Sequence, residues 1–268
     1  MNRVRPSVAA GRFYPARRDE LAGLLDRLCS SAHRTLPAGE LRAVVAPHAG
    51  YMYSGTVAAT AFAALPAPTP VLRVTLLGPS HFTPLDGAAA SDADIWQTPL
   101  GDVLVDDELR AAAVDAGAIV DPGPHRDDHA LEVELPFLQR RAGTDLRVLP
   151  IAVGGHSAEA IARLVSALAG DSVIVVSTDL SHYLGEAEAR RRDRRTADAV
   201  VALDHESIGD RDACGASALR GLVACAGRAG WLCTLLDLRT SADAVGETDR
   251  VVGYGAFAFT DAARTEGP

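Results

Sequence analysis

The chain of 268 residues contains no lysine, because all 26 of its Lys and Arg residues are arginines. Without lysine the protein cannot form a Schiff base through its own side chains, bind pyridoxal phosphate in the usual way or build a nucleotide-binding P-loop. These enzyme classes are therefore excluded. The formal net charge of −9 also argues against nucleic acid as a partner.

Export and membrane signals are also absent. No apolar run approaches the roughly 18 residues that a membrane span requires, and the N-terminus lacks the apolar stretch of a signal peptide. The four cysteines form no CxxC pair, so neither a zinc knuckle nor a disulfide framework is expected. We therefore expect a cytoplasmic protein with no membrane partner.

Short apolar runs alternate with helical patterns along the chain. The patterns predict strands at 41–46, 71–77, 146–153, 172–176, 231–238 and 250–259, and helices at 53–65, 106–116, 129–141, 157–168, 186–203 and 216–228. This alternation is typical of an α/β sandwich with a central, mostly parallel or mixed sheet flanked by helices. The sequence has no linker or repeat. We predict one domain over residues 1–268, with an ordered core of about 4–260 and frayed ends before Val8 and beyond Thr260.

Three histidines each follow a predicted strand. His48 lies in APHAGY, His81 in GPSH and His182 in STDLSHY. In open α/β sheets, ligands and catalytic groups gather beyond the carboxyl ends of the strands. Imidazole is both a common metal ligand and the usual general base near neutral pH. The sequence therefore predicts one site that these histidines share.

Other polar residues accompany these histidines. Asp179 precedes His182 by three residues, so its carboxylate can orient the imidazole; alternatively, Asp179 and Ser181 cap the helix that follows. Cys214, in DACGAS, precedes the predicted helix 216–228, where a thiol is expected to have a lowered pKa. It would serve either as the third ligand of a catalytic metal or as the nucleophile of a Cys/His hydrolase.

Further candidates lie close to these residues in the sequence. His129, in DDHALEVELPFL, can share a helix face with Glu132, or it is a partly buried histidine bonded to a neighbour. Tyr51 and Tyr53 follow His48 and would line the cleft, although Tyr53 also suits a core position. The arginines between 190 and 195 have acidic neighbours and indicate a solvated helix face.

Several segments together carry a family resemblance. They are VRPSVAAGRFYP, APHAGYMYSG, LLGPSH, TPLGDVLVD, DHALEVELPFLQ, STDLSHY, ACGAS and VVGYGAFAF, which extend from Val4 to Phe259. In this combination and order the sequence resembles the Memo family, also called AmmeMemoRadiSam system protein B. That family is similar in fold to class III extradiol dioxygenases, which bind non-haem Fe(II).

The resemblance implies a set of roles. It assigns His48, His81 and Cys214 as metal ligands, Asp179 and His182 as an acid/base pair, and His129 to the same cleft. Ring-cleaving relatives offer iron two histidines and a carboxylate, whereas here a cysteine stands in place of the carboxylate, and its thiolate also suits copper or zinc. The usual Glu-His-Ser of the family reads Asp128-His129-Ala130 in this chain.

The expected function is that of a non-haem Fe(II) oxidoreductase with dioxygenase-like chemistry. Its partners would be O₂ and a small aromatic or enediol substrate, and the resemblance adds a radical-SAM protein as a partner. Two alternatives stay open from the sequence: a non-catalytic adaptor that binds a metal or a peptide, and the Cys/His hydrolase.

Overall fold

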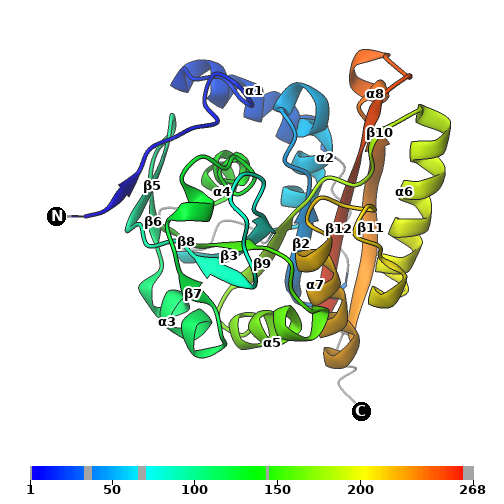
Figure 1. The fold of residues 1–268 in the computed structure, drawn as a ribbon. Coiled ribbons are helices and arrows are strands. Elements are labelled where there is room, and N and C mark those ends of the chain that lie inside the picture. The colour runs from blue at the N-terminus through cyan, green and yellow to red at the C-terminus, as the bar shows by residue number, and fades with distance from the viewer. Residues whose placement is uncertain (1, 33–37, 66–70, 143–144, 262–268) are drawn as a thin grey trace, which may run out of the picture.

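Four parallel strands form the centre of the sheet in the computed structural model, which describes residues 2–32, 38–65, 71–142 and 145–261. They lie side by side in the order β8 (Asp145–Val153), β3 (Val71–Pro79), β9 (Val173–Ser177) and β2 (Leu41–Ala46) (Figure 1). These strands are rich in valine, leucine and isoleucine and are largely buried, as parallel strands covered on both faces must be.

Further strands extend the sheet in both directions and make it mixed. Beyond β8 come β6 (Gly101–Val105), β5 (Ile95–Thr98) and β1 (Val4–Arg5), while β4 (Ala88–Ala90) pairs with β8 and with β7 (Ile119–Val120). Beyond β2 lies β12 (Val251–Asp261), which runs antiparallel to β2 and also pairs with β10 (His182–Leu184) and β11 (Trp231–Thr240).

Helices cover the sheet (Figure 1). One group of helices that pack on one another consists of α1 (Arg18–Ser31), α2 (Tyr51–Ala63) and α4 (Leu135–Arg141). A second group consists of α3 (Asp107–Asp115), α5 (Ala158–Leu168) and α7 (Ala216–Ala229). Helix α6 (Glu186–Val201) packs on β11 and β12, which α8 (Ala242–Val245) connects. The predicted α/β fold with a mixed sheet is confirmed. In the part of the chain that the structure describes, no helix is long and apolar enough to cross a membrane.

The predicted strands and most predicted helices occur within one or two residues of their expected bounds. The predicted helix 129–141 is wrong in its first half, where the 3₁₀ helix η2 (Glu132–Glu134) precedes α4. Asp128 accepts a hydrogen bond from the Ala130 amide and holds a turn there. Pro136 has no N–H and therefore suits only the first turn of a helix, which delays the start of α4.

The N-terminal end is better ordered than predicted. Val4 and Arg5 form β1 and pair with Ile95 and Trp96 of β5, so the prediction of a frayed end before Val8 is wrong for this strand. Arg5 is buried, since its guanidinium lies over Trp96 and pairs with Glu132. The predicted frayed end beyond Thr260 lies, after Asp261, outside the described residues.

Strand order brings the predicted site together. Strand β9 lies between β2 and β3, and all three are parallel, so their carboxyl ends meet at one edge of the sheet. The loops that follow these ends carry His48, His81 and Asp179, and His182 begins β10 a few residues later.

Candidate metal centre

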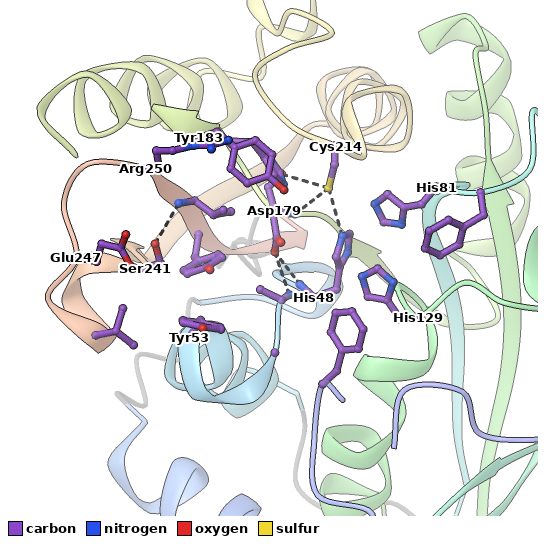
Figure 2. Close-up of a pocket in the computed structure, with 18 residues that line it drawn as sticks. His48, Tyr53, His81, His129, Asp179, Tyr183, Cys214, Ser241, Glu247 and Arg250 are labelled. Carbon is purple, nitrogen blue, oxygen red and sulfur yellow. Dashed lines mark hydrogen bonds between the residues drawn. The ribbon is translucent and has the colours of Figure 1, made fainter. Parts of the chain in front are cut away.

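A cavity of about 840 Å³ opens beyond the carboxyl ends of β2, β3 and β9 (Figure 2). One end is lined by His48, His81, His129, Asp179 and Cys214. The other end is lined by residues that connect β11 to β12, among them Glu247 and Arg250. Segments that are distant in sequence thus supply the polar groups of one pocket.

Three imidazoles face one another at the first of these ends. One donor nitrogen from each of His48, His81 and His129 lies within 4.8 Å of the others, a group that could hold a metal ion. Burial, followed by the neighbouring histidines, lowers the pKa of His129 to about 3, and burial likewise lowers the pKa of His48 to about 3. Both rings are therefore neutral at neutral pH, which is the form that binds metals.

His48 is held from two directions. Its amide donates to Asp179 Oδ1 at 2.9 Å, and its Nδ1 lies 2.9 Å from Ser177 Oγ. Ser177 Oγ also lies 2.8 Å from the Ala130 carbonyl, which can only accept a hydrogen bond. If Ser177 donates its one proton there, His48 must donate from Nδ1. That arrangement leaves the Nε2 lone pair facing Cys214 and the cavity.

Glu134 completes this network as a neutral acid. Its Oε1 lies 2.7 Å from the same Ser177 oxygen, while its Oε2 is buried without a partner among the described residues. If Ser177 donates its one proton to Ala130, Glu134 must carry the proton of its own contact with Ser177. Burial raises the pKa of Glu134 well above its usual value, which agrees with this assignment. No pattern in the sequence singles out Glu134 or Ser177.

Asp128 supports His81. It accepts from the His81 amide at 2.6 Å through Oδ2, and its Oδ1 lies 3.1 Å from His81 Nδ1. Burial would raise the pKa of Asp128, but hydrogen bonds from His81 and Ala130 outweigh it and lower the pKa to about 2. A charged carboxylate on Nδ1 fixes the ring with Nε2 free to bind. The only sequence signal for this role was the departure from the Glu-His-Ser pattern at position 128.

His129 is fixed by stacking. Its ring lies on Phe13 with centroids 3.9 Å apart, and on His81 with centroids 5.0 Å apart. The resemblance gave His129 a catalytic place in the cleft, and the structure groups its nitrogen with those of the two predicted histidine ligands.

Cys214 lies beside this group. Its sulfur is 3.3 Å from His48 Nε2 and accepts from the Asp179 amide at 3.3 Å. Two donors on one tetrahedral ion lie about 3.5 Å apart, given bonds of about 2.3 Å to sulfur and 2.1 Å to nitrogen. The spacing therefore suits joint coordination with His48, although the group whose donor atoms all lie within 4.8 Å of one another is formed by the three histidines without Cys214. Gly215 makes this approach feasible, since a Cβ there would lie 2.9 Å from Thr178.

The expected lowering of the Cys214 pKa is wrong. Burial, and then the charge of Asp179, raise the pKa of the thiol to about 12. Proximity to the start of α7 does not compensate for a desolvated sulfur beside a carboxylate. A neutral thiol next to an imidazole of low pKa does not form the ion pair of a Cys/His hydrolase, whereas a bound cation would deprotonate it.

The sequence predicts that the Asp179 carboxylate orients the His182 ring, but the ring is instead hydrogen-bonded to a backbone carbonyl. Asp179 Oδ1 accepts from the amides of His48 and Ala49, and burial raises its pKa to about 6. His182 Nδ1 lies 2.8 Å from the Leu180 carbonyl and donates to it. The carbonyl thus fixes the ring with Nε2 as the acceptor nitrogen, and His182 opposes the effect of burial on the Asp179 pKa.

The two tyrosines differ. Tyr53 lines the cavity and is 40% exposed. The prediction that Tyr51 lines the cleft is wrong, because Tyr51 is buried and packs on Tyr14 and Phe137. Its hydroxyl donates to the Val133 carbonyl at 2.7 Å. Tyr51 begins α2 on the side that faces the core.

Comparisons with known proteins agree with the resemblance. The family model described as Memo-like protein matches residues 5–258. The chain belongs to the Memo-like family. A MEMO1 family protein of Methanosarcina acetivorans is 36% identical over 95% of this chain and 98% of its own length. The family proteins of Methanopyrus kandleri and Aeropyrum pernix are 34% and 36% identical, again over 95% of this chain.

Proposed function

We propose that this Memo-like protein is a metal-dependent oxidoreductase with dioxygenase-like chemistry on a small aromatic or enediol substrate. The group of three imidazoles at one end of a large cavity carries the proposal. Imidazole nitrogens that converge in this way, with His48 and His81 each held at Nδ1 by another side chain, are the arrangement that a metal site requires.

The donor set fits a transition metal. Imidazole nitrogens suit iron, copper and zinc, and the Cys214 sulfur beside His48 adds a soft donor. We propose Fe(II), held by His48 and His81 together with His129 and Cys214. The ion would supply O₂ activation and would acidify a hydroxyl group of the bound substrate.

The protein would supply the proton transfers. His182, fixed by the Leu180 carbonyl, accepts the proton of a substrate hydroxyl at Nε2 and later returns it. Asp179 lies close enough for its carboxylate to interact electrostatically with this ring. The apolar wall, which includes Phe82 and Tyr53, would hold the substrate ring and exclude water.

Metal analysis and oxygen uptake test the proposal. Protein purified without oxygen should contain iron, and a panel of catechols should then start O₂ consumption. His48→Ala and His81→Ala should lose both the metal and the turnover. His156→Ala is a matched control, because His156 is exposed and does not line the cavity.

Two outcomes would contradict the proposal. If His48→Ala retains the full metal content, the histidine group is not the metal site. If the protein retains the metal but no aromatic diol is turned over, the oxidoreductase proposal fails, and a metal-binding adaptor is the better description.

A further inference from the structure

The cavity is larger than a single aromatic ring needs. Pockets of roughly 300–1,000 Å³ accept ligands of drug size, and this one has about 840 Å³. His48, His81 and His129 occupy only one end of it, while Tyr183, Glu247 and Arg250 form the other end (Figure 2). A substrate that fills the cavity therefore extends from the histidines toward this other end.

Arg250 supplies the positive charge of this other end. It is the one arginine that lines the cavity, and it forms no ion pair with any carboxylate in the described ranges. Its guanidinium lies over the ring of Tyr183, 5.0 Å from the centroid. Stacking of this kind fixes the orientation of the guanidinium and leaves its N–H groups free to donate. Two of these N–H groups can bind the two oxygens of a carboxylate at the same time.

The backbone below Arg250 is shaped for this contact. Tyr183 has a φ of +59°, a left-handed conformation that costs free energy for a residue other than glycine. The pairing of β10 with β12 shifts its register between His182 and Leu184, so Tyr183 lies in a bulge. Bulges beside functional sites redirect side chains. Here the bulge places the ring that supports Arg250 directly after the proposed acid/base residue.

We propose that Arg250, supported by Tyr183, determines specificity by binding a carboxylate at the far end of an extended aromatic substrate. The proposal rests on the proposed function for the position of the diol end. Glu247 is the other charged residue at this end of the cavity, and no ion pair joins it to Arg250. The negative charge of Glu247 would weaken the attraction of Arg250 for an anion, but the paired N–H donors of the guanidinium would remain.

Binding of matched probes tests the proposal. The probes are ω-(3,4-dihydroxyphenyl)alkanoates with tails of one to five methylenes, their uncharged amides, and the corresponding phenylalkanoates without hydroxyls. Calorimetry with the metal-loaded protein gives the affinities. We expect one tail length to bind about tenfold more tightly as the acid than as the amide, since a charged hydrogen bond contributes about 1.5 kcal/mol.

Variants identify the residue responsible. Arg250→Gln should remove the preference for the acid and leave amide affinity unchanged, whereas Arg250→Lys should restore part of the preference. Glu247→Gln should strengthen acid binding. Arg228→Gln is the control, because Arg228 is at the end of α7, pairs with Glu159 and does not line the cavity.

The outcomes separate this inference from the proposed function. Equal affinity for acid and amide at every tail length, or a preference that survives Arg250→Gln, overturns the role of Arg250. If the phenylalkanoates bind as tightly as the diols and still depend on Arg250, the carboxylate site stands and the diol at the metal fails.

Discussion

Glu132 is predicted to anchor the N-terminal segment, and Glu132→Gln tests this. The side chain is fully buried, and both of its carboxylate oxygens accept hydrogen bonds from that segment. The donors are Arg5 Nη1, Ser7 Oγ, Val8 N, Ala9 N and Tyr14 Oη, at 2.5–2.9 Å. A glutamine would place an N–H₂ among donors and leave a buried guanidinium without its partner charge.

The cost follows from this geometry. Arg5 is only 6% exposed, and breaking a buried ion pair by removing one partner costs about 3–5 kcal/mol. The free energy of unfolding, measured by urea denaturation at pH 7, should fall by that amount. The same segment carries Phe13, which stacks on His129, so metal affinity should fall as well.

The pH dependence has a defined sign. Burial would raise the pKa of Glu132, but Arg5 and the hydrogen bonds outweigh it and hold the pKa below its usual value. The carboxylate therefore stabilises the fold above the pKa of the unfolded chain, and that stability is lost as the pH falls through the folded pKa. The difference in the free energy of unfolding between wild type and Glu132→Gln should therefore become smaller in acid.

Glu134→Gln is the matched control for this experiment. Glu134 is buried two residues away, but burial raises its pKa, so glutamine conserves both its shape and the neutral form that burial favours. We expect a change of about 1 kcal/mol or less. Equal losses of unfolding free energy in the two variants, or a loss below about 1 kcal/mol in Glu132→Gln, would refute the assignment of a charged Glu132 and a neutral Glu134.

Three further predictions concern the metal centre. His182→Ala should keep the metal, while O₂ uptake with a substrate falls by about two to four orders of magnitude; loss of the metal would instead make His182 a ligand. Asp128→Asn should weaken metal affinity about 10–100-fold in a chelator competition, with His156→Ala as the unchanged control. Iodoacetamide should label Cys214 of the chelated protein at pH 7 at least about a hundredfold more slowly than free cysteine, as peptide mass spectrometry would show, because its pKa is raised to about 12. Rapid labelling would favour the hydrolase.

The sequence alone determined which edge of the sheet carries this site. Apolar runs buried on both faces identify the parallel strands, and the residue after a strand falls at the carboxyl edge whatever the rest of the chain does. That is why His48 and His81 could be placed without coordinates. The Ser157 side chain caps α5 at the start of the predicted helix 157–168, because capping depends only on neighbours within one turn.

The tertiary structure decided which groups support these residues. Asp128 reaches His81 across 47 positions and Arg5 reaches Glu132 across 127, and no local pattern encodes such pairs. Whether Tyr51 faces the cavity or the core depends on the rotation of α2 against its neighbours, which spacing from His48 cannot give. The charge states of Glu134 and Cys214 follow from desolvation, and desolvation exists only once the chain has folded around them.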